Sequence, residues 1–249
     1  TELRTRLNKA IWHRVEHPAA VSMTRPQQNF LTYEEARRQP LTAVSAYPHV
    51  WGPKWAQAWF RLEVPRAALK DGLYLLWDDE GEATLYADGM PWYGIDAGHH
   101  RAPLPQKARE LWIEGTCSRT GVWVGDGKYL SEDGSVLRGV SFWKRDDTAW
   151  EVYWDFCVLL DLLEFEYRHY LTADEDWNRA NGYHQPVFRV SALFRRIMRG
   201  LDDFADVFDH DGYKAASILK KLYASLPASS ASLKGLLTGH AHIDLVWLW

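Results

Sequence analysis

The chain has 249 residues, of which 47% are hydrophobic and 25% are charged, the balance of a folded protein rather than a disordered or fibrous one. Its formal net charge of -4 leaves no basic surplus, which disfavours a protein that follows nucleic-acid phosphates. No apolar run reaches the roughly 20 residues of a membrane span, and the charged start is unlike a signal peptide. We therefore expect a soluble chain of two ordinary domains, with no nucleic acid and no membrane among its partners.

Cysteine and tryptophan usage adds two further expectations. Cys117 and Cys157 are the only cysteines and form no C-x-x-C pair, so we expect two buried thiols in a reducing, cytoplasmic location. The 14 tryptophans indicate either a heavily aromatic core or surfaces that stack on sugars. Composition alone leaves both explanations open.

The first 54 residues are expected to form a helix followed by an irregular arm. Leu3, Leu7, Ile11 and Val15 are spaced four apart, which predicts one helix that stops before Pro18. Residues 19–53 show no period and are rich in Pro, Gln, Arg and Ser, so they are predicted to lie as an arm over another element.

Residues 55–147 have the period-two pattern of an antiparallel β-sandwich. In AWFRLEV, Ala58, Phe60 and Leu62 are predicted to face one way, with Trp59 and Arg61 facing the other. Asp88-Gly89, which lies between two strand-like runs, predicts a tight hairpin. Many short strands with turn signals and no intervening helix predict the sandwich.

Residues 148–228 return to a helical period. A first helix is predicted after Asp146-Asp147-Thr148, which can supply its N-cap. Residues 172–186 are polar and broken by Gly182 and Pro186, so a loop is predicted there. Two further helices are expected at about 186–205 and 209–225. From 229 a small and polar linker leads into an apolar strand, the expected start of another domain.

The segment GHAHID carries the clearest chemical signal of the chain. His240, His242 and Asp244 are two residues apart, so on a strand all three project from one face. Imidazole and carboxylate suit Zn²⁺, and strand ends are where α/β folds place their sites. The alternative is that histidines at a strand end are satisfied by backbone partners.

The string GHAHIDLVWLW closely resembles the opening motif of bacterial and cytosolic-type α-mannosidases of glycoside hydrolase family 38, G-H-[AS]-H-I-D-x-A-W-L-W-P, and departs from it at Val246. EGEATLYADGMPWYGIDAGHH also resembles the N-terminal β-sandwich of that family, which has a galactose-binding-like fold. The resemblance implies a multidomain α+β fragment: the sandwich, a helical segment, and the first strand of an α/β catalytic barrel over residues 229–249.

The resemblance implies a zinc-dependent retaining hydrolysis of terminal α-mannosides in mannose-containing oligosaccharides. His242 and Asp244 would bind zinc, which holds sugar hydroxyls O2 and O3, and Trp247 would lie against the mannose ring. His240 would be a neighbour of the metal rather than a ligand. Because a metal-bound Asp244 is not available as nucleophile or acid/base, both of those residues are expected beyond Trp249, and the chain alone is expected to be inactive.

Two other functions remain open at this point. One is a zinc hydrolase of the amidohydrolase type, which would use His240 and His242 as ligands; whether His240 binds the metal separates it from a mannosidase. The other is a non-catalytic carbohydrate-binding or scaffold module, in which residues 1 to about 150 pack on a catalytic domain or mediate assembly into a homo-oligomer.

Weaker signals in the sandwich are explained by ordinary surface and core roles. His99-His100 is predicted to be a solvated pair on a loop. The acidic residues between positions 78 and 82 lack the spacing of a Ca²⁺ loop and are predicted to form a solvated turn. Trp92 and Tyr93 could stack on a sugar, although core positions are the commoner place for such rings.

Overall fold

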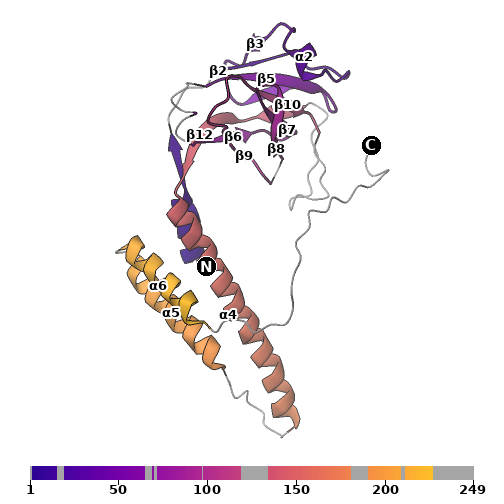
Figure 1. Cartoon of the computed structure of the whole chain (residues 1–249). Coiled ribbons are helices and arrows are strands. Elements are labelled where there is room, and N and C mark those ends of the chain that lie inside the picture. Colours follow the sequence, from indigo (N-terminus) through magenta and orange to yellow (C-terminus); the bar gives the residue numbers. More distant parts are fainter. Residues whose placement is uncertain are drawn as a thin grey trace. The chain divides into compact units, whose positions relative to one another are not determined.

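A computed structural model gives the fold and describes residues 2–15, 20–64, 69, 72–96, 98–118, 134–180, 190–208 and 211–226. The chain divides into two compact units, Thr1–Trp154 and Asp155–Trp249. Most of the regular secondary structure described in the first unit is β-strand, and the described part of the second unit is helical (Figure 1). Over the described ranges, no helix is both long and apolar enough to cross a membrane.

The first unit is built from antiparallel strands, so the predicted β-sandwich is confirmed. A four-stranded sheet contains, in order, β1 (Trp12–Val15), β12 (Gly139–Arg145), β6 (Tyr74–Asp78) and β9 (Arg101–Pro103). A six-stranded sheet contains, in order, β3 (Thr42–Ala43), β2 (Ala20–Met23), β5 (Gln57–Glu63), β10 (Leu111–Thr116), β7 (Glu82–Ala87) and β8 (Met90–Ile95). β11 (Ser135–Leu137) pairs with β4 (His49–Trp51). The helices α1 (Glu2–Ile11) and α2 (Tyr33–Ala36) accompany the sheets.

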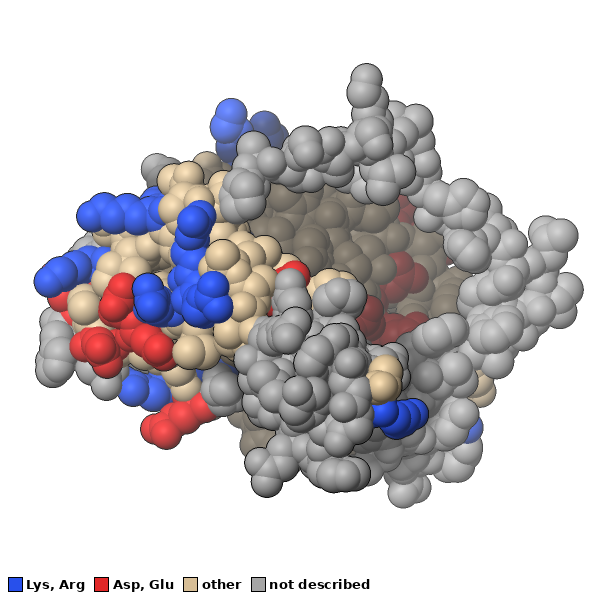
Figure 2. Space-filling model, turned by 90° about the horizontal axis from the view of Figure 1, so that it is seen from below, with Lys and Arg blue, Asp and Glu red and all other residues tan. Residues whose placement is uncertain are grey.

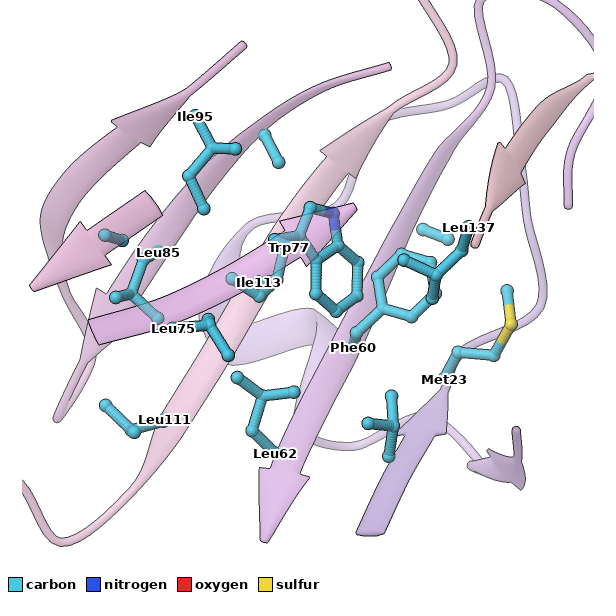
Figure 3. Packing of buried hydrophobic residues seen from close by; sticks show 14 of the residues in the cluster. Met23, Phe60, Leu62, Leu75, Trp77, Leu85, Ile95, Leu111, Ile113 and Leu137 are labelled. Carbon is cyan, nitrogen blue, oxygen red and sulfur yellow. The ribbon is translucent and has the colours of Figure 1, made fainter. Parts of the chain in front are cut away.

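The core lies between the facing sheets and is centred on aromatic rings (Figure 3). Phe60 of β5 meets Trp77 of β6 edge to face, with ring centroids 5.0 Å apart. It also meets Trp51 of β4 in the same way at 5.3 Å. Because all three rings are buried, one residue joins strands from all three sheets.

The period-two pattern of β5 places the predicted residues in the core, with one surprise. Ala58, Phe60 and Leu62 are buried in the main core as expected. Trp59 faces the other way, yet only 1% of it is exposed, because it packs with Trp112 and Ala36 of α2. Both faces of β5 are therefore covered.

The predicted hairpin at Asp88-Gly89 is confirmed. Both residues have positive φ, 50° and 82°, which matches the right-handed twist of two-residue hairpins. They join β7 to β8, with Ala87 opposite Met90. The Asp88 carboxylate also accepts hydrogen bonds from the backbone N–H groups of Arg109 and Glu110, at 2.8 and 3.0 Å, so the turn is tied to the approach of β10.

The N-terminal region is more regular than expected. The first helix ends at Ile11, and residues 12–15 form β1, which pairs with β12 more than 120 residues later. The expected irregular arm supplies β2, β3 and β4 to the sheets, and α2 begins with a reciprocal capping box between Thr32 and Glu35. These pairings join segments far apart in sequence, which is why local patterning missed them. The domain boundaries at 54, 147 and 228 stay predictions.

Three capped helices follow the sandwich: α4 (Asp147–Ala180), α5 (Ala192–Phe208) and α6 (Gly212–Ser225). The side chains of Asp146, Ser191 and Asp211 accept hydrogen bonds from backbone N–H groups in the first turns, at 2.8 to 3.0 Å. The predicted N-cap is therefore Asp146. The predicted loop at 172–186 is wrong at its start, because α4 continues to Ala180; its sequence has no helix breaker before Gly182.

The second unit packs through apolar helix faces. The buried residues of α5 recur three or four positions apart, at Phe194, Ile197, Leu201 and Phe204. Phe156 of α4 packs on Phe204 with ring centroids 5.5 Å apart. α5 and α6 approach closely at Gly200, where an added Cβ would lie 2.6 Å from Leu222.

Gly81 offers a test of the packing in the sandwich. A Cβ at this buried position would lie 2.5 Å from the backbone oxygen of Thr116, which has no flexible end to move aside. We expect Gly81→Ala to lower the free energy of unfolding by about 2 kcal/mol in urea denaturation, the usual cost of overpacking. Gly94→Ala is the control, since no atom lies within 4 Å of its added Cβ. Equal stability of the two variants would contradict this packing.

Candidate functional site

The residues predicted to bind zinc and sugar, His240, His242, Asp244 and Trp247, lie outside the described residues. The zinc site therefore stays a prediction from sequence. Among the residues that are described, no group of three or more His, Cys, Asp or Glu is arranged to hold a metal ion. The described part of the chain instead presents four polar or aromatic clusters and one groove between two helices.

The His99-His100 segment is a turn held by Asp96. One carboxylate oxygen of Asp96 accepts the backbone N–H groups of Gly98 and His99, at 2.7 and 2.8 Å, and lies 3.0 Å from His99 Nδ1. Burial raises the pKa of Asp96, but the hydrogen bonds from His99 and Gly98 outweigh it and leave the pKa below its usual value. The prediction of a solvated side chain is right for His99, which is 74% exposed, while His100 is half-buried.

The predicted solvated acidic turn is wrong for Asp79, which is only 2% exposed. Its carboxylate accepts hydrogen bonds from Trp51 Nε1 at 3.1 Å, Ser135 Oγ at 2.9 Å and the backbone N–H of Gly81 at 3.1 Å. Trp51 lies on β4 and Ser135 on β11, so Asp79 fastens that two-stranded sheet to the end of β6. Burial raises the pKa of Asp79 above its usual value despite these hydrogen bonds, which favour the ionised form.

The outer face of the six-stranded sheet carries a cluster of aromatic rings and carboxylates. Tyr33 of α2 lies parallel to Tyr86 of β7, with ring centroids 5.9 Å apart. Each phenol binds a glutamate of the β10 region: Tyr33 donates to Glu110 at 2.7 Å and Tyr86 donates to Glu114 at 3.0 Å. The buried Trp59 packs edge to face against both tyrosine rings.

This cluster holds α2 on the sheet and does not form a hydrolytic pair. Burial and the bond to Glu114 raise the pKa of Tyr86 to about 12, so the phenol stays protonated. Burial raises the pKa of Glu110, but its hydrogen bonds and the charges of two arginines outweigh this effect, so the pKa lies below its usual value. Glu110 and Glu114 are four residues apart on an extended chain, about 13 Å. A retaining glycosidase needs its two carboxyl groups about 5 Å apart.

The outer face of the four-stranded sheet alternates arginines with aromatic rings, and we name it the arginine–aromatic face. The Arg101 guanidinium lies over Trp12 at 4.9 Å and over Trp143 at 5.3 Å from the ring centroids. Arg145 likewise lies over Tyr74 and over Trp150 of α4, at 5.4 and 5.0 Å, and its Nε donates to Asp147 at 2.7 Å. The face is made of Trp12, Tyr74, Arg101, Trp143, Arg145 and Trp150.

Sequence reasoning missed the arginine–aromatic face. Its members come from β1, β6, β9, β12 and the start of α4, and only the strand pairing brings them together. One signal was present: Tyr74 and Trp143 occupy outward positions of strands whose inward residues are apolar. Trp12 gave no such signal, because a helical stripe includes its neighbour Ile11.

The helical unit carries a groove of about 560 Å³ between α5 and α6, lined by Arg195, Arg196, Arg199 and Lys221 among others. Figure 2 shows Lys and Arg side chains gathered beside Asp and Glu over these helices. Two of the arginines bind backbone carbonyl groups, Arg195 that of Val190 and Arg196 that of Ser225. They thereby satisfy carbonyl groups next to the ends of the helices.

The described residues thus define an antiparallel β-sandwich module followed by a helical unit. Residues 17–139 match the family described as "Alpha-mannosidase, jelly roll domain". Residues 17–139 therefore form the jelly-roll domain of an α-mannosidase, and the recognition of the chain as the N-terminal portion of a family 38 α-mannosidase is confirmed.

Solved structures of β-glucuronidase from Ruminococcus gnavus also match the chain. The complex with an N1-substituted uronic isofagomine is 8% identical, with a TM-score of 0.33, covering 54% of this chain and 29% of that one. The apo structure is 9% identical, also with a TM-score of 0.33, covering 54% of this chain and 28% of that one. This chain therefore spans less than a third of those proteins, and the likeness assigns it no function. No curated protein matches the chain.

Asp79 gives a prediction about pH. Because burial raises its pKa in the folded state above the unfolded value of about 3.9, its protonated form stabilises the fold. That contribution is complete below the unfolded pKa and is lost as pH rises through the folded pKa. We expect the unfolding free energy of the chain, minus that of Asp79→Asn, to fall as pH rises from about 4 toward neutrality.

Urea titrations followed by tryptophan fluorescence at several pH values measure this difference. The contributions of the other carboxyl groups to the pH dependence cancel, because both proteins contain those groups. A difference that stays constant, or that rises with pH, would show that the hydrogen bonds from Trp51, Ser135 and Gly81 outweigh the burial of Asp79.

Proposed function

We propose that this chain is the N-terminal part of a zinc-dependent retaining α-mannosidase that removes terminal α-linked mannose from oligosaccharides. The observation that carries the proposal is the match of residues 17–139 to the α-mannosidase jelly-roll domain. Those residues are separate from GHAHIDLVWLW, the motif that suggested the zinc chemistry. Two distant parts of the chain therefore support the same kind of enzyme.

In this proposal the end of the chain contributes to metal and sugar binding. His242, as neutral imidazole, and Asp244, as carboxylate, are two of the zinc ligands, a donor set that suits this metal. Bound zinc would supply positive charge to hold and orient two neighbouring hydroxyls of the sugar. Trp247 would stack against the ring, and its flat apolar face suits the C–H surface of a pyranose.

The nucleophile and the acid/base residue are proposed to lie beyond Trp249. In this proposal Asp244 is committed to the metal, and three carboxylates of the described sandwich are bound by other side chains. Asp79 is buried beneath Trp51, and Glu110 and Glu114 are separately bound by tyrosines. The sandwich would thus act as an accessory module of the enzyme rather than as its reaction centre.

We expect the purified 249-residue chain to show no hydrolysis of an aryl α-mannoside, because a retaining mechanism requires two carboxyl groups and both are proposed to lie beyond Trp249. Release of nitrophenol from p-nitrophenyl α-mannoside measures this directly. Turnover by the chain above that of a heat-denatured sample would contradict the assignment of the reacting carboxyl groups.

In the enzyme that contains this chain, His242→Ala and Asp244→Ala are expected to lower kcat/KM for the same substrate at least about 100-fold and to lower the bound zinc measured by metal analysis. The control is His99→Ala, because His99 is exposed and makes only local contacts with Asp96. His240→Ala separates the alternatives. It should retain zinc in a mannosidase, whereas loss of zinc from this variant would favour an amidohydrolase-type centre on His240 and His242.

A further inference from the structure

The guanidinium of Arg101 is held in one orientation by two indole rings. It lies 4.9 Å from the ring centroid of Trp12 on β1 and 5.3 Å from that of Trp143 on β12. Both distances fall within the range of a cation–π contact. With both indoles packed against it, the group presents its edge rather than its faces to other molecules.

That edge has no acceptor within the described structure. Arg101 Nε is buried and has no hydrogen-bond partner, and neither an ion pair nor a side-chain hydrogen bond involves Arg101. The two terminal nitrogens are likewise without partners but, unlike Nε, are not among the buried atoms. Arg145, in the same face, differs because Asp147 satisfies it. Arg101 therefore offers a planar fork of free donors, which suits a carboxylate or phosphate.

An exposed indole is held on the strand that carries Arg101. Trp92 of β8 is 51% exposed, and its Nε1 donates to the backbone oxygen of Pro103 at 2.8 Å, which fixes the ring beside β9. Pro103 and Arg101 are two residues apart on that strand, opposite Tyr74 and Leu76 of β6, and so lie on the same face. The Cα atoms of Arg101 and Pro103 are about 7 Å apart on an extended strand, so the Trp92 ring is held two residues along β9 from Arg101.

We propose that the sandwich binds an anionic sugar at this place, with Arg101 holding a carboxylate or phosphate substituent and Trp92 stacking on the ring. The free fork and the fixed, exposed indole are complementary to the two parts of such a ligand. The proposal concerns only the sandwich and does not depend on zinc or on the residues beyond 226.

A sugar fits these observations better than an acidic protein surface. A protein partner would need a broad apolar area around the arginine, whereas Tyr74, Trp143 and Arg145 here are already paired with one another or with Arg101. The groups left to contact a ligand are the Arg101 guanidinium and the Trp92 ring, and these suit a single monosaccharide unit.

The 249-residue chain tests the proposal in isothermal titration with four probes: mannose 6-phosphate, glucuronic acid, methyl α-mannoside and inorganic phosphate. We expect the two anionic sugars to bind at least about tenfold more tightly than the neutral mannoside and than phosphate alone, because each part of the site adds to the affinity. Equal binding of all four probes, binding of phosphate as tight as that of mannose 6-phosphate, or no binding at all would overturn it.

Single substitutions test whether Arg101 and Trp92 form the binding site. Arg101→Gln and Arg101→Lys are each expected to weaken anionic-sugar binding about tenfold or more, since lysine keeps the charge but not the planar fork. Trp92→Ala should weaken binding to a similar extent and serves as a test if the arginine variants unfold. The matched control is Arg37→Gln, because Arg37 also lies over an aromatic ring, Tyr33, but on the other sheet.

Thermal unfolding reports whether each variant is folded. Unchanged affinity in folded Arg101→Gln would overturn the proposal, as would equal weakening by Arg37→Gln. If the chain self-associates in sedimentation experiments, and Arg101→Gln abolishes this while no anionic sugar binds the parent chain, the face is a protein contact and the proposal is wrong.

Discussion

The packing of Phe60 between Trp51 and Trp77 is the contact on which the sandwich depends. These rings come from β5, β4 and β6, so their edge-to-face arrangement fixes the three sheets against one another. Interiors are close-packed, and such a cluster leaves little freedom for the strands around it. Trp51 has a second role, because its Nε1 binds the buried carboxylate of Asp79. Apolar packing and one buried carboxyl group thus hold the same strand.

With the inner faces occupied, the outer faces of the two sheets take different roles. The six-stranded sheet is covered by α2, through Tyr33, Trp59 and Trp112, and its glutamates are bound by tyrosines. The four-stranded sheet instead carries the arginine–aromatic face, in which Arg145 is satisfied by Asp147 and Arg101 is not. Packing explains much of the high tryptophan content. Trp55, Trp92 and Trp154 are about half exposed, and Trp92 is the ring proposed to stack on a sugar.

For a member of the α-mannosidase family, this arrangement places the packed sandwich and the proposed metal site in different parts of the chain. In the sandwich, Asp79, Glu110 and Glu114 are bound by other side chains, and the proposed metal ligands follow at the far end of the sequence. A sugar-binding face on the sandwich would add recognition without taking part in hydrolysis. Such a division is physically reasonable, because strand-borne side chains held by packing keep a binding geometry without help from flexible loops.

The sequence by itself determined the elements whose signals are local: the alternation of Ala58, Phe60 and Leu62, the Asp88-Gly89 turn, the cap at Asp146 and the helical stripe of α5. It also determined the family, through the terminal motif and the sandwich strings. Only the tertiary structure decided that Trp12–Val15 is a strand, that Asp79 is buried, that Trp59 is covered on the outer face, and that Arg101 lies between Trp12 and Trp143. Each of these depends on a partner that is tens of residues away, and neither periodicity nor residue type encodes which distant strand will supply it.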